Sequence, residues 1–493
     1  MSHPAASVGD TESFFQSPQQ SHFARRWSAA QVDRLRNPGG LEEYPLANTQ
    51  GLKLRNKLSE VATKRETCWT FGAADPIMAH EMGEAGFETL YQSGANATLC
   101  ETPTFDCGGD LADYTYDTLP KRVKQIVQNQ LHWARVDRTR DTCNLDRLVP
   151  IIADGDSGHG NSTATMKLVK LFLDAGAAAI HFDDMLSGEK NFSVGSLTHV
   201  LVPVREHIRR LLAAKLQLDI AGVHTVLIAR TDSESASRIT SAIDPLDRPF
   251  ILGRTKLGHP SLSRRMMDSK SVGAVRLAEE QAWEQEARLC TLDEAVREQC
   301  SLEDYKSFES PSRGLDVADA LLIARQYGVI WDCEGCRNTR GWYRYRGNIE
   351  AAIARSKAYA DYADMVWSCA PGYNLDNVKR YASAIHEKFP GKWMGYNWSF
   401  GTFESEYSSH ESDEDIASLV RTVGRLGFVW QFNPQAGFYE QGVAMNRFAK
   451  AMYKDHMLPY VKSIDAGTKE GVSVVDWYEQ AGDLTDAMTD AIQ

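Results

Sequence analysis

The chain contains 493 residues, enough to bury a large hydrophobic core without disulfides or metals. Apolar residues make up 43% and charged residues 24%, the ordinary balance of a globular protein, and no apolar run approaches the ~18 residues of a membrane-spanning helix. The formal net charge of −12 argues against nucleic acid or an anionic membrane surface as the partner. We therefore expect a small molecule as the partner.

The two ends of the sequence show no targeting signal. The start, MSHPAASVGDTESFF, has no apolar signal core, and the end, DAMTDAIQ, has no peroxisomal tripeptide. The nine scattered cysteines are an odd number, which is typical of reduced intracellular thiols. The close pair Cys333 and Cys336 has no second pair at a spacing that suits zinc, so we interpret it as incidental. We expect an intracellular protein located in the cytoplasm.

From about Cys68 onward, short apolar runs alternate with helical patterns. Continuous apolar runs are typical of strands buried on both faces of a parallel sheet, and stretches such as TATMKLVKLFLDAG show amphipathic helical spacing. Eight such runs predict an α/β fold, a (β/α)8 TIM-type barrel with Trp367 and Trp430 in its core. The rival, a doubly wound open sheet, lacks its GxGxxG motif here. The runs are residues 68–75, 88–94, 149–158, 177–184, 225–232, 364–370, 393–399 and 428–433.

The alternation breaks between about residues 235 and 340, a stretch too long for one connection. A charged helical pattern at 275–299 indicates an inserted helical subdomain there. The predicted organisation is an N-terminal extension with helices (1–66), the first part of the barrel (67–245), the inserted helical subdomain (246–340), the second part of the barrel (341–455) and a C-terminal helical extension (456–493).

Acidic residues follow several of the predicted strands, at the end of the barrel where active residues lie. Asp154 and Asp156 follow the third run, Asp183 ends the fourth, and Asp110 lies between the second and third. Converging carboxylates repel one another unless a cation neutralises them, and all-oxygen ligands suit Mg²⁺, with Mn²⁺ as the alternative ion. Arg230, at the end of the fifth run, could grip a substrate carboxylate. Helix or turn capping is the competing interpretation for any single Asp.

Seven motifs resemble those of one enzyme family: TFGAADP (70–76), DLADYTYDTLPKRV (110–123), VPIIADGDSGHG (149–160), VLVPVREHI (200–208), IARTDSESASRITSAID (228–244), WDCEG (331–335) and WQF (430–432). In these motifs the chain is similar to isocitrate lyase and 2-methylisocitrate lyase, especially the eukaryotic form with a helical insertion. The similarity extends from about Trp27 to Val474. It implies a (β/α)8 barrel, Mg²⁺, a homotetramer with exchanged helices, and cleavage of a carbon–carbon bond in a tricarboxylate.

Part of the family's active site has matching residues here. The residues that match the metal-binding carboxylates are Asp110, Asp154, Asp156 and Asp183, the last in place of the usual Glu. The residues that match the substrate-binding positions are Ser93, Gly94, Arg230, Asn397 and Ser399. Tyr91 also matches the family pattern.

The family's catalytic signature, Lys-Lys-Cys-Gly-His, is missing. Its Cys protonates the leaving carbanion, but the matching stretch here is EKNFSVG (189–195), in which only Lys190 matches. Further departures are Ala95 for a Trp, Cys369 for a Glu, Pro434 for a Thr, and Phe400 and Gly401 in a loop that usually holds the substrate. The candidates for a replacement proton donor are Cys369, Tyr91, His199 and Ser193.

We therefore expect a Mg²⁺-dependent carbon–carbon lyase that acts on an altered 2-hydroxy di- or tricarboxylate, such as an alkylated one, and releases an α-oxo acid. Lys190, Cys369 and Tyr91 are the expected catalytic residues. One alternative is a slow isocitrate or 2-methylisocitrate lyase, and another is a non-catalytic regulatory paralogue. A phosphonopyruvate- or oxaloacetate-type hydrolase is a third, because residues 190–193 resemble the Lys-x-Asn-Ser of phosphoenolpyruvate mutase and phosphonopyruvate hydrolase.

Overall fold

The computed structural model describes residues 8–37, 43–104, 106, 110–140, 146–190, 199–398, 412–472 and 474–493. Every predicted apolar run contains a strand. These are β1 (Cys68–Phe71), β2 (Leu90–Gln92), β3 (Ile151–Asp154), β4 (Ala179–Asp183), β6 (Val226–Thr231), β11 (Met365–Ser368), β12 (Trp393–Asn397) and β13 (Phe428–Asn433). They form one parallel sheet in the order β1-β13-β12-β11-β6-β4-β3-β2.

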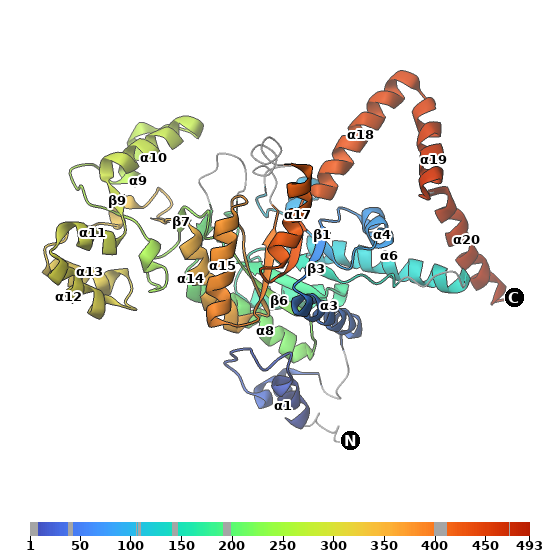
Figure 1. The fold of residues 1–493 in the computed structure, drawn as a ribbon, viewed down its shortest axis with the longest axis horizontal. Helices are drawn as coiled ribbons and strands as arrows, with labels where there is room; N and C mark the ends of the chain where they lie inside the picture. The colour runs from blue at the N-terminus through green and yellow to red at the C-terminus, as the bar shows by residue number, and fades with distance from the viewer. Residues whose placement is uncertain are drawn as a thin grey trace.

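The two outer strands of this sheet meet and close it. Gly72, directly after β1, forms a parallel bridge with Tyr91 of β2, and the Ala73 N–H donates to the Tyr91 carbonyl at 3.0 Å. Inside the sheet the Trp430 and Phe432 rings stack 4.1 Å apart, and Trp367 is 1% exposed. The predicted (β/α)8 TIM-type barrel with a core of aromatic side chains is therefore confirmed (Figure 1).

Helices connect the barrel strands, as the sequence patterns predict. The pattern TATMKLVKLFLDAG becomes one helix because the Asn161 side chain accepts the Ala164 N–H at its start and Gly176 adopts φ 88° at its end. The helices are α4 (Pro76–Glu84), α5 (Gly94–Cys100), α6 (Thr118–Arg140), α7 (Ser162–Ala175), α8 (Val204–Ala221), α14 (Ile349–Tyr359), α15 (Leu375–Lys388) and α17 (Asp413–Gly424).

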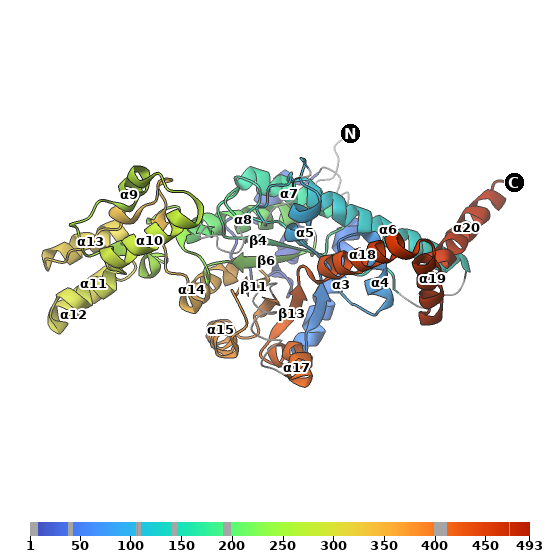
Figure 2. The same cartoon turned by 90° about the horizontal axis from the view of Figure 1, so that it is seen from above.

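A second group of helices lies between β6 and α14 and projects away from the barrel (Figure 2). It contains α9 (Leu262–Ser269), α10 (Gly273–Ala287), α11 (Leu292–Gln299), α12 (Leu302–Ser312) and α13 (Val317–Gln326). The short strands around it are β5 (Val200–Leu201), β7 (Arg238–Ile239) and β10 (Tyr343–Arg344) in one sheet, and β8 (Gly253–Arg254) with β9 (Leu289–Cys290) in another.

The charged pattern at 275–299 is not one continuous helix. Arg288 takes φ 51° and ends α10, and β9 follows. Thr291 then starts α11 with a capping box, in which the Glu294 side chain accepts the Thr291 N–H at 2.9 Å. The insertion is therefore helical as predicted, but this stretch forms two helices, because the first ends at Arg288 and Thr291 caps the start of the second.

Helical extensions flank the barrel at both ends of the chain. The N-terminal helices are α1 (Val8–Gln16), α2 (Ala29–Leu35) and α3 (Pro45–Lys64), and the C-terminal helices are α18 (Ala436–Asp455), α19 (Leu458–Glu470) and α20 (Val474–Asp490). In Figure 1, α18 and α19 form an arm that leaves the barrel, and α20 returns to α6, where the Trp477 ring lies 5.8 Å from the Trp133 ring. Within the described residues, no helix combines the length and apolarity needed to cross a membrane.

Candidate active site

The four predicted metal-binding carboxylates lie together at the carboxyl ends of β3 and β4. Asp154 ends β3, Asp156 follows it, Asp183 ends β4, and Asp110 reaches in from the segment between α5 and α6. The Lys190 ammonium lies at the centre of this group. Its Nζ is 2.5 Å from Asp156 Oδ1 and 3.5 Å from both Asp110 Oδ2 and Asp183 Oδ2. The structure thus brings Lys190 and the carboxylates into one cluster.

Burial and charge act in opposite directions on these carboxylates. Burial raises the pKa of Asp183 to about 7 and that of Asp110 to about 6, although Lys190 opposes both shifts. Burial would also raise the pKa of Asp154, but its interactions with His181 and with the positively charged Lys190 and Arg230 lower it overall. The pKa of Lys190 itself is raised well above its usual value, because the carboxylates outweigh its burial. Lys190 therefore stays charged at any physiological pH.

The carboxylate oxygens of the cluster are the kind of ligand that a hard divalent cation prefers. Within the described part of the chain, Asp110 Oδ1, Asp156 Oδ2 and both carboxylate oxygens of Asp183 are buried and accept no hydrogen bond. Buried acceptors of this kind need a cation or ordered water. As they stand in the described residues, no three acidic, His or Cys side chains are close enough to hold a metal ion. An ion would therefore have to draw the carboxylates together around it.

Gly94 lies against the same carboxylates. Its N–H donates to Asp154 Oδ2 at 3.1 Å. A Cβ at this position would meet the Tyr114 hydroxyl at 2.6 Å, Asp154 Oδ2 at 2.8 Å and Asp156 Oδ2 at 2.9 Å, so only glycine fits. Ser93 precedes it and caps α5 through the Asn96 N–H. The two predicted substrate-binding residues Ser93 and Gly94 therefore lie beside the cluster.

Tyr91 forms a hydrogen-bonded group with Asp154 and a histidine that the sequence analysis missed. The Tyr91 hydroxyl lies 3.2 Å from Asp154 Oδ2 and 3.0 Å from His181 Nε2. Burial lowers the pKa of His181 to about 4, so the imidazole is neutral near pH 7. His181 stands two residues before Asp183 on β4, and side chains two apart on a strand point the same way. This two-residue spacing was the feature of the sequence from which the position of His181 beside Asp183 could have been predicted.

The neighbouring Asp184 points away from the cluster. Its Oδ2 accepts hydrogen bonds from Arg355 at 2.7 Å, Thr231 at 2.6 Å and Tyr359 at 3.0 Å. Its Oδ1 accepts the Asp232 N–H at 3.0 Å. Asp184 therefore anchors the segment after β6 from outside the barrel, whereas Asp183 faces the interior.

Arg230 and Cys369 form the other side of the site. The Arg230 guanidinium donates to Asp232 Oδ1 at 2.8 Å and lies 4.5 Å from the centre of a Trp367 ring. Trp367 in turn donates to Asn397 Oδ1 at 3.1 Å, so this core residue also supports the site. The Cys369 thiol is 7% exposed and contacts Asp232, and burial raises its pKa to about 12 despite the Arg230 charge.

Not all of the predicted residues belong to the part of the chain that the structure describes. Ser399, Ser193, Phe400, Gly401 and the rest of the stretches 191–198 and 399–411 lie outside the described residues. His199 Nδ1 lies 2.9 Å from Ser235 Oγ.

Comparison with known proteins shows similarity over almost the whole chain. A model described as the isocitrate lyase family matches residues 7–493. The chain is 34% identical over 491 residues to an isocitrate lyase of Oryza sativa subsp. japonica, covering 93% of this chain and 84% of that protein. It is 31% identical over 486 residues to a mitochondrial 2-methylisocitrate lyase of Schizosaccharomyces pombe, with 94% and 92% covered. A crystal structure of 2,3-dimethylmalate lyase matches with a TM-score of 0.48 and 16% identity, covering 90% of this chain and 98% of that one.

Proposed function

Because this chain belongs to the isocitrate lyase family, we propose that it is a Mg²⁺-dependent carbon–carbon lyase that cleaves a 2-hydroxy di- or tricarboxylate and releases an α-oxo acid. The observation that supports this proposal most is the buried cluster of Asp110, Asp156 and Asp183 around Lys190, at the carboxyl ends of the barrel strands. Active sites of (β/α)8 barrels lie at this end.

In this proposal, the carboxylates of Asp110, Asp154, Asp156 and Asp183 would hold the ion, with Mn²⁺ as the alternative to Mg²⁺. The bound ion would polarise the substrate oxygen and offset negative charge that develops on it. The charges of the site support a bound cation. The buried carboxylates outnumber the two positively charged side chains, Lys190 and Arg230, so negative charge remains to be neutralised.

The chain's own residues would bind and orient the substrate. Arg230 lies on the inner face of the barrel, where its planar guanidinium suits a substrate carboxylate. Tyr91 would relay the proton of the substrate hydroxyl. The Tyr91 oxygen would accept that proton while its own phenol proton passes to Nε2 of the neutral His181 imidazole, 3.0 Å away. As that proton leaves, the hydroxyl-bearing carbon becomes the carbonyl of the α-oxo acid and the carbon–carbon bond breaks. Its electron pair stays on the carbon of the other fragment, beside that fragment's carboxylate.

Cys369 is our candidate for the acid that protonates this fragment. Its thiol holds its proton near pH 7, because burial raises its pKa to about 12. The Arg230 charge beside it would stabilise the thiolate that remains. A donor with so high a pKa gives up its proton reluctantly, so we expect slower turnover than from an acid matched to neutral pH.

The substrate would differ from isocitrate on one side. Ala95 stands where the family has a Trp, and it is 7% exposed beside Gly94. The missing indole would leave room for an apolar group, so we favour an alkylated substrate.

The test follows cleavage by proton NMR with Mg²⁺ and a panel of acids. The panel contains isocitrate, 2-methylisocitrate, longer 2-alkylisocitrates, dimethylmalate, oxaloacetate and phosphonopyruvate. Asp154→Asn should abolish turnover, whereas Asp174→Asn, whose side chain is 64% exposed, should not. Cleavage of an alkylated acid would support the proposal, and slow cleavage of isocitrate alone would support the unaltered lyase. Turnover of oxaloacetate or phosphonopyruvate would move the protein to the hydrolase alternative, and no turnover with any acid would favour the non-catalytic paralogue.

We further propose that the protein assembles as a homotetramer through its C-terminal arm. Among the described residues of α18 and α19, only Gly437 is buried. The exposed apolar residues of these helices and of the turn between them include Met445, Tyr453, Met457 and Leu458, with Tyr453 90% exposed. Light scattering should give four times the 55.0 kDa of one chain. Tyr453→Glu with Met457→Glu should reduce that mass, and an unchanged mass would contradict the role of the arm.

A further inference from the structure

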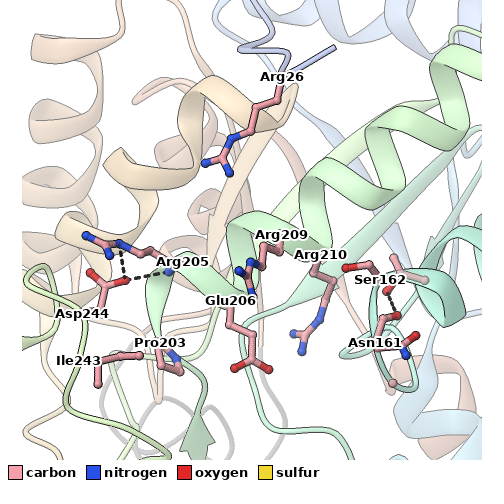
Figure 3. A pocket seen from close by; sticks show the side chains of 12 residues that line it. Arg26, Asn161, Ser162, Pro203, Arg205, Glu206, Arg209, Arg210, Ile243 and Asp244 are labelled. Atoms are coloured by element: carbon pink, nitrogen blue, oxygen red, sulfur yellow. Dashed lines mark hydrogen bonds and ion pairs between the residues drawn. The ribbon is translucent and has the colours of Figure 1, made fainter. Parts of the chain in front are cut away.

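A cavity of about 510 Å³ lies on the outer side of the barrel, apart from the carboxylate cluster. Its walls come from the segment between α1 and α2, the start of α7, the start of α8 and the residues before the insertion. Figure 3 shows Arg209, Arg210 and Glu206 together on α8, with Arg26 reaching towards them from the N-terminal segment.

The cavity is basic although the whole chain is acidic. Its lining contains four arginines and two carboxylates, in a chain with a net charge of −12. One arginine, Arg205, has a carboxylate partner, because its Nε lies 3.9 Å from Asp244 Oδ2. Arg26, Arg209 and Arg210 then face the single carboxylate of Glu206. A small volume that concentrates positive charge in this way attracts anions.

The starts of the two helices add little to this attraction. The first N–H groups of α8 are already taken, since Asp247 accepts the Val204 N–H at 3.1 Å and Asp244 accepts the Arg205 N–H at 2.9 Å. Asn161 likewise accepts the Ala164 N–H of α7. The arginine side chains, rather than helix ends, therefore give the cavity its affinity for anions.

Arg210 links the cavity to the barrel interior. The residue is 6% exposed, and its Nη1 donates to the backbone carbonyl of Asp183 and, at 3.4 Å, to that of Met185. These two hydrogen bonds fix one end of the guanidinium to the end of β4. A buried arginine held in this way presents a preorganised partner to a ligand, at a lower entropic cost than a mobile one.

We propose that this cavity binds a small dianion, with either a phosphate group or paired carboxylate groups, at a site separate from the carboxylate cluster. Arg209 and Arg26 would contact the anion from two sides, and Arg210 would bind it from the barrel wall. Planar guanidinium groups form paired hydrogen bonds to phosphate and carboxylate oxygens alike. This proposal does not depend on the lyase function, because it uses neither the metal-binding carboxylates nor turnover.

Titration calorimetry on the full chain, without Mg²⁺, tests the proposal with inorganic phosphate and with malonate as probes. Both Arg209→Gln and Arg26→Gln should weaken binding about tenfold, the loss expected for one charge-assisted pair, and neither should affect folding because both side chains are exposed. Lys170→Gln removes another exposed positive charge, from α7 and outside the cavity, and should leave binding unchanged.

The two probes separate the sources of the anion. Stronger binding of phosphate would indicate a phosphate ester as the natural ligand, and stronger binding of malonate would indicate a dicarboxylate. The proposal is overturned if neither anion releases heat at millimolar concentration. It is equally overturned if the two arginine variants bind like the Lys170 variant, because the anion would then lie elsewhere.

Discussion

Replacement of Arg355 by leucine should destabilise the protein strongly. Its guanidinium is 1% exposed and donates to Asp184 at 2.7 Å, to Asp247 at 2.7 and 3.1 Å, and to the Val202 carbonyl at 3.0 Å. Leucine would leave two buried carboxylates without their cation. Breaking a buried ion pair from one side costs about 3–5 kcal/mol, so we expect the free energy of unfolding to fall by that amount.

Urea unfolding of the full chain measures this loss, with Arg380→Leu as the matched control. Arg380 pairs with Glu350 on the surface, where the two side chains are 61% and 48% exposed, and its loss should cost at most about 1 kcal/mol. If the two variants lost similar amounts of unfolding free energy, the buried ion pairs of Arg355 would not be what stabilises the protein.

The loss from Arg355→Leu should also depend on pH. Burial raises the pKa of Asp247 to about 6 even with Arg355 present, so the folded protein binds this proton more tightly than the unfolded chain. Without the arginine, that pKa should rise further. A protonated Asp247 needs no cation, so the penalty should be largest above pH 6 and should shrink as the pH falls. A penalty that grows on acidification would contradict this account.

Three further outcomes concern the site. Cys369→Ala should lower kcat about 10²–10⁴-fold with little change in KM, whereas Cys290→Ala, in the insertion, should leave kcat unchanged. Equal kcat values for the two variants would exclude Cys369 as the acid. Mg²⁺ affinity measured by calorimetry should rise between pH 6 and 8, with release of a proton on binding. Burial raises the pKa of Asp183 to about 7, and the ion requires the ionised form of this carboxylate. An affinity that does not change with pH would contradict this account. Gly94→Ala should weaken Mg²⁺ binding about tenfold, because the added Cβ would lie within 2.9 Å of two site carboxylates. In the control Gly258→Ala the added Cβ points into open space, so this variant should bind Mg²⁺ normally.

The strands of the barrel could be predicted because their signal is local. A strand buried on both faces is mostly apolar, and each of the eight runs contains a short apolar segment that can be recognised without reference to the rest of the chain. The acidic cluster followed from the same positions, since parallel strands bring their carboxyl ends to one rim. The two-residue period of β4 would also have identified His181 as a neighbour of Asp183, although the sequence analysis did not use it.

By itself, the sequence determined the (β/α)8 barrel, the helical insertion and the convergence of Asp110, Asp154, Asp156 and Asp183, because periodicity and strand ends are properties of short segments. Only the tertiary structure decided that Lys190 occupies the centre of these carboxylates. It also decided that Arg355 pairs with Asp184 behind the site, and which arginines line the outer cavity. Some of these contacts join distant positions, as Asp184 with Arg355, and all of them depend on how whole elements pack rather than on any local pattern.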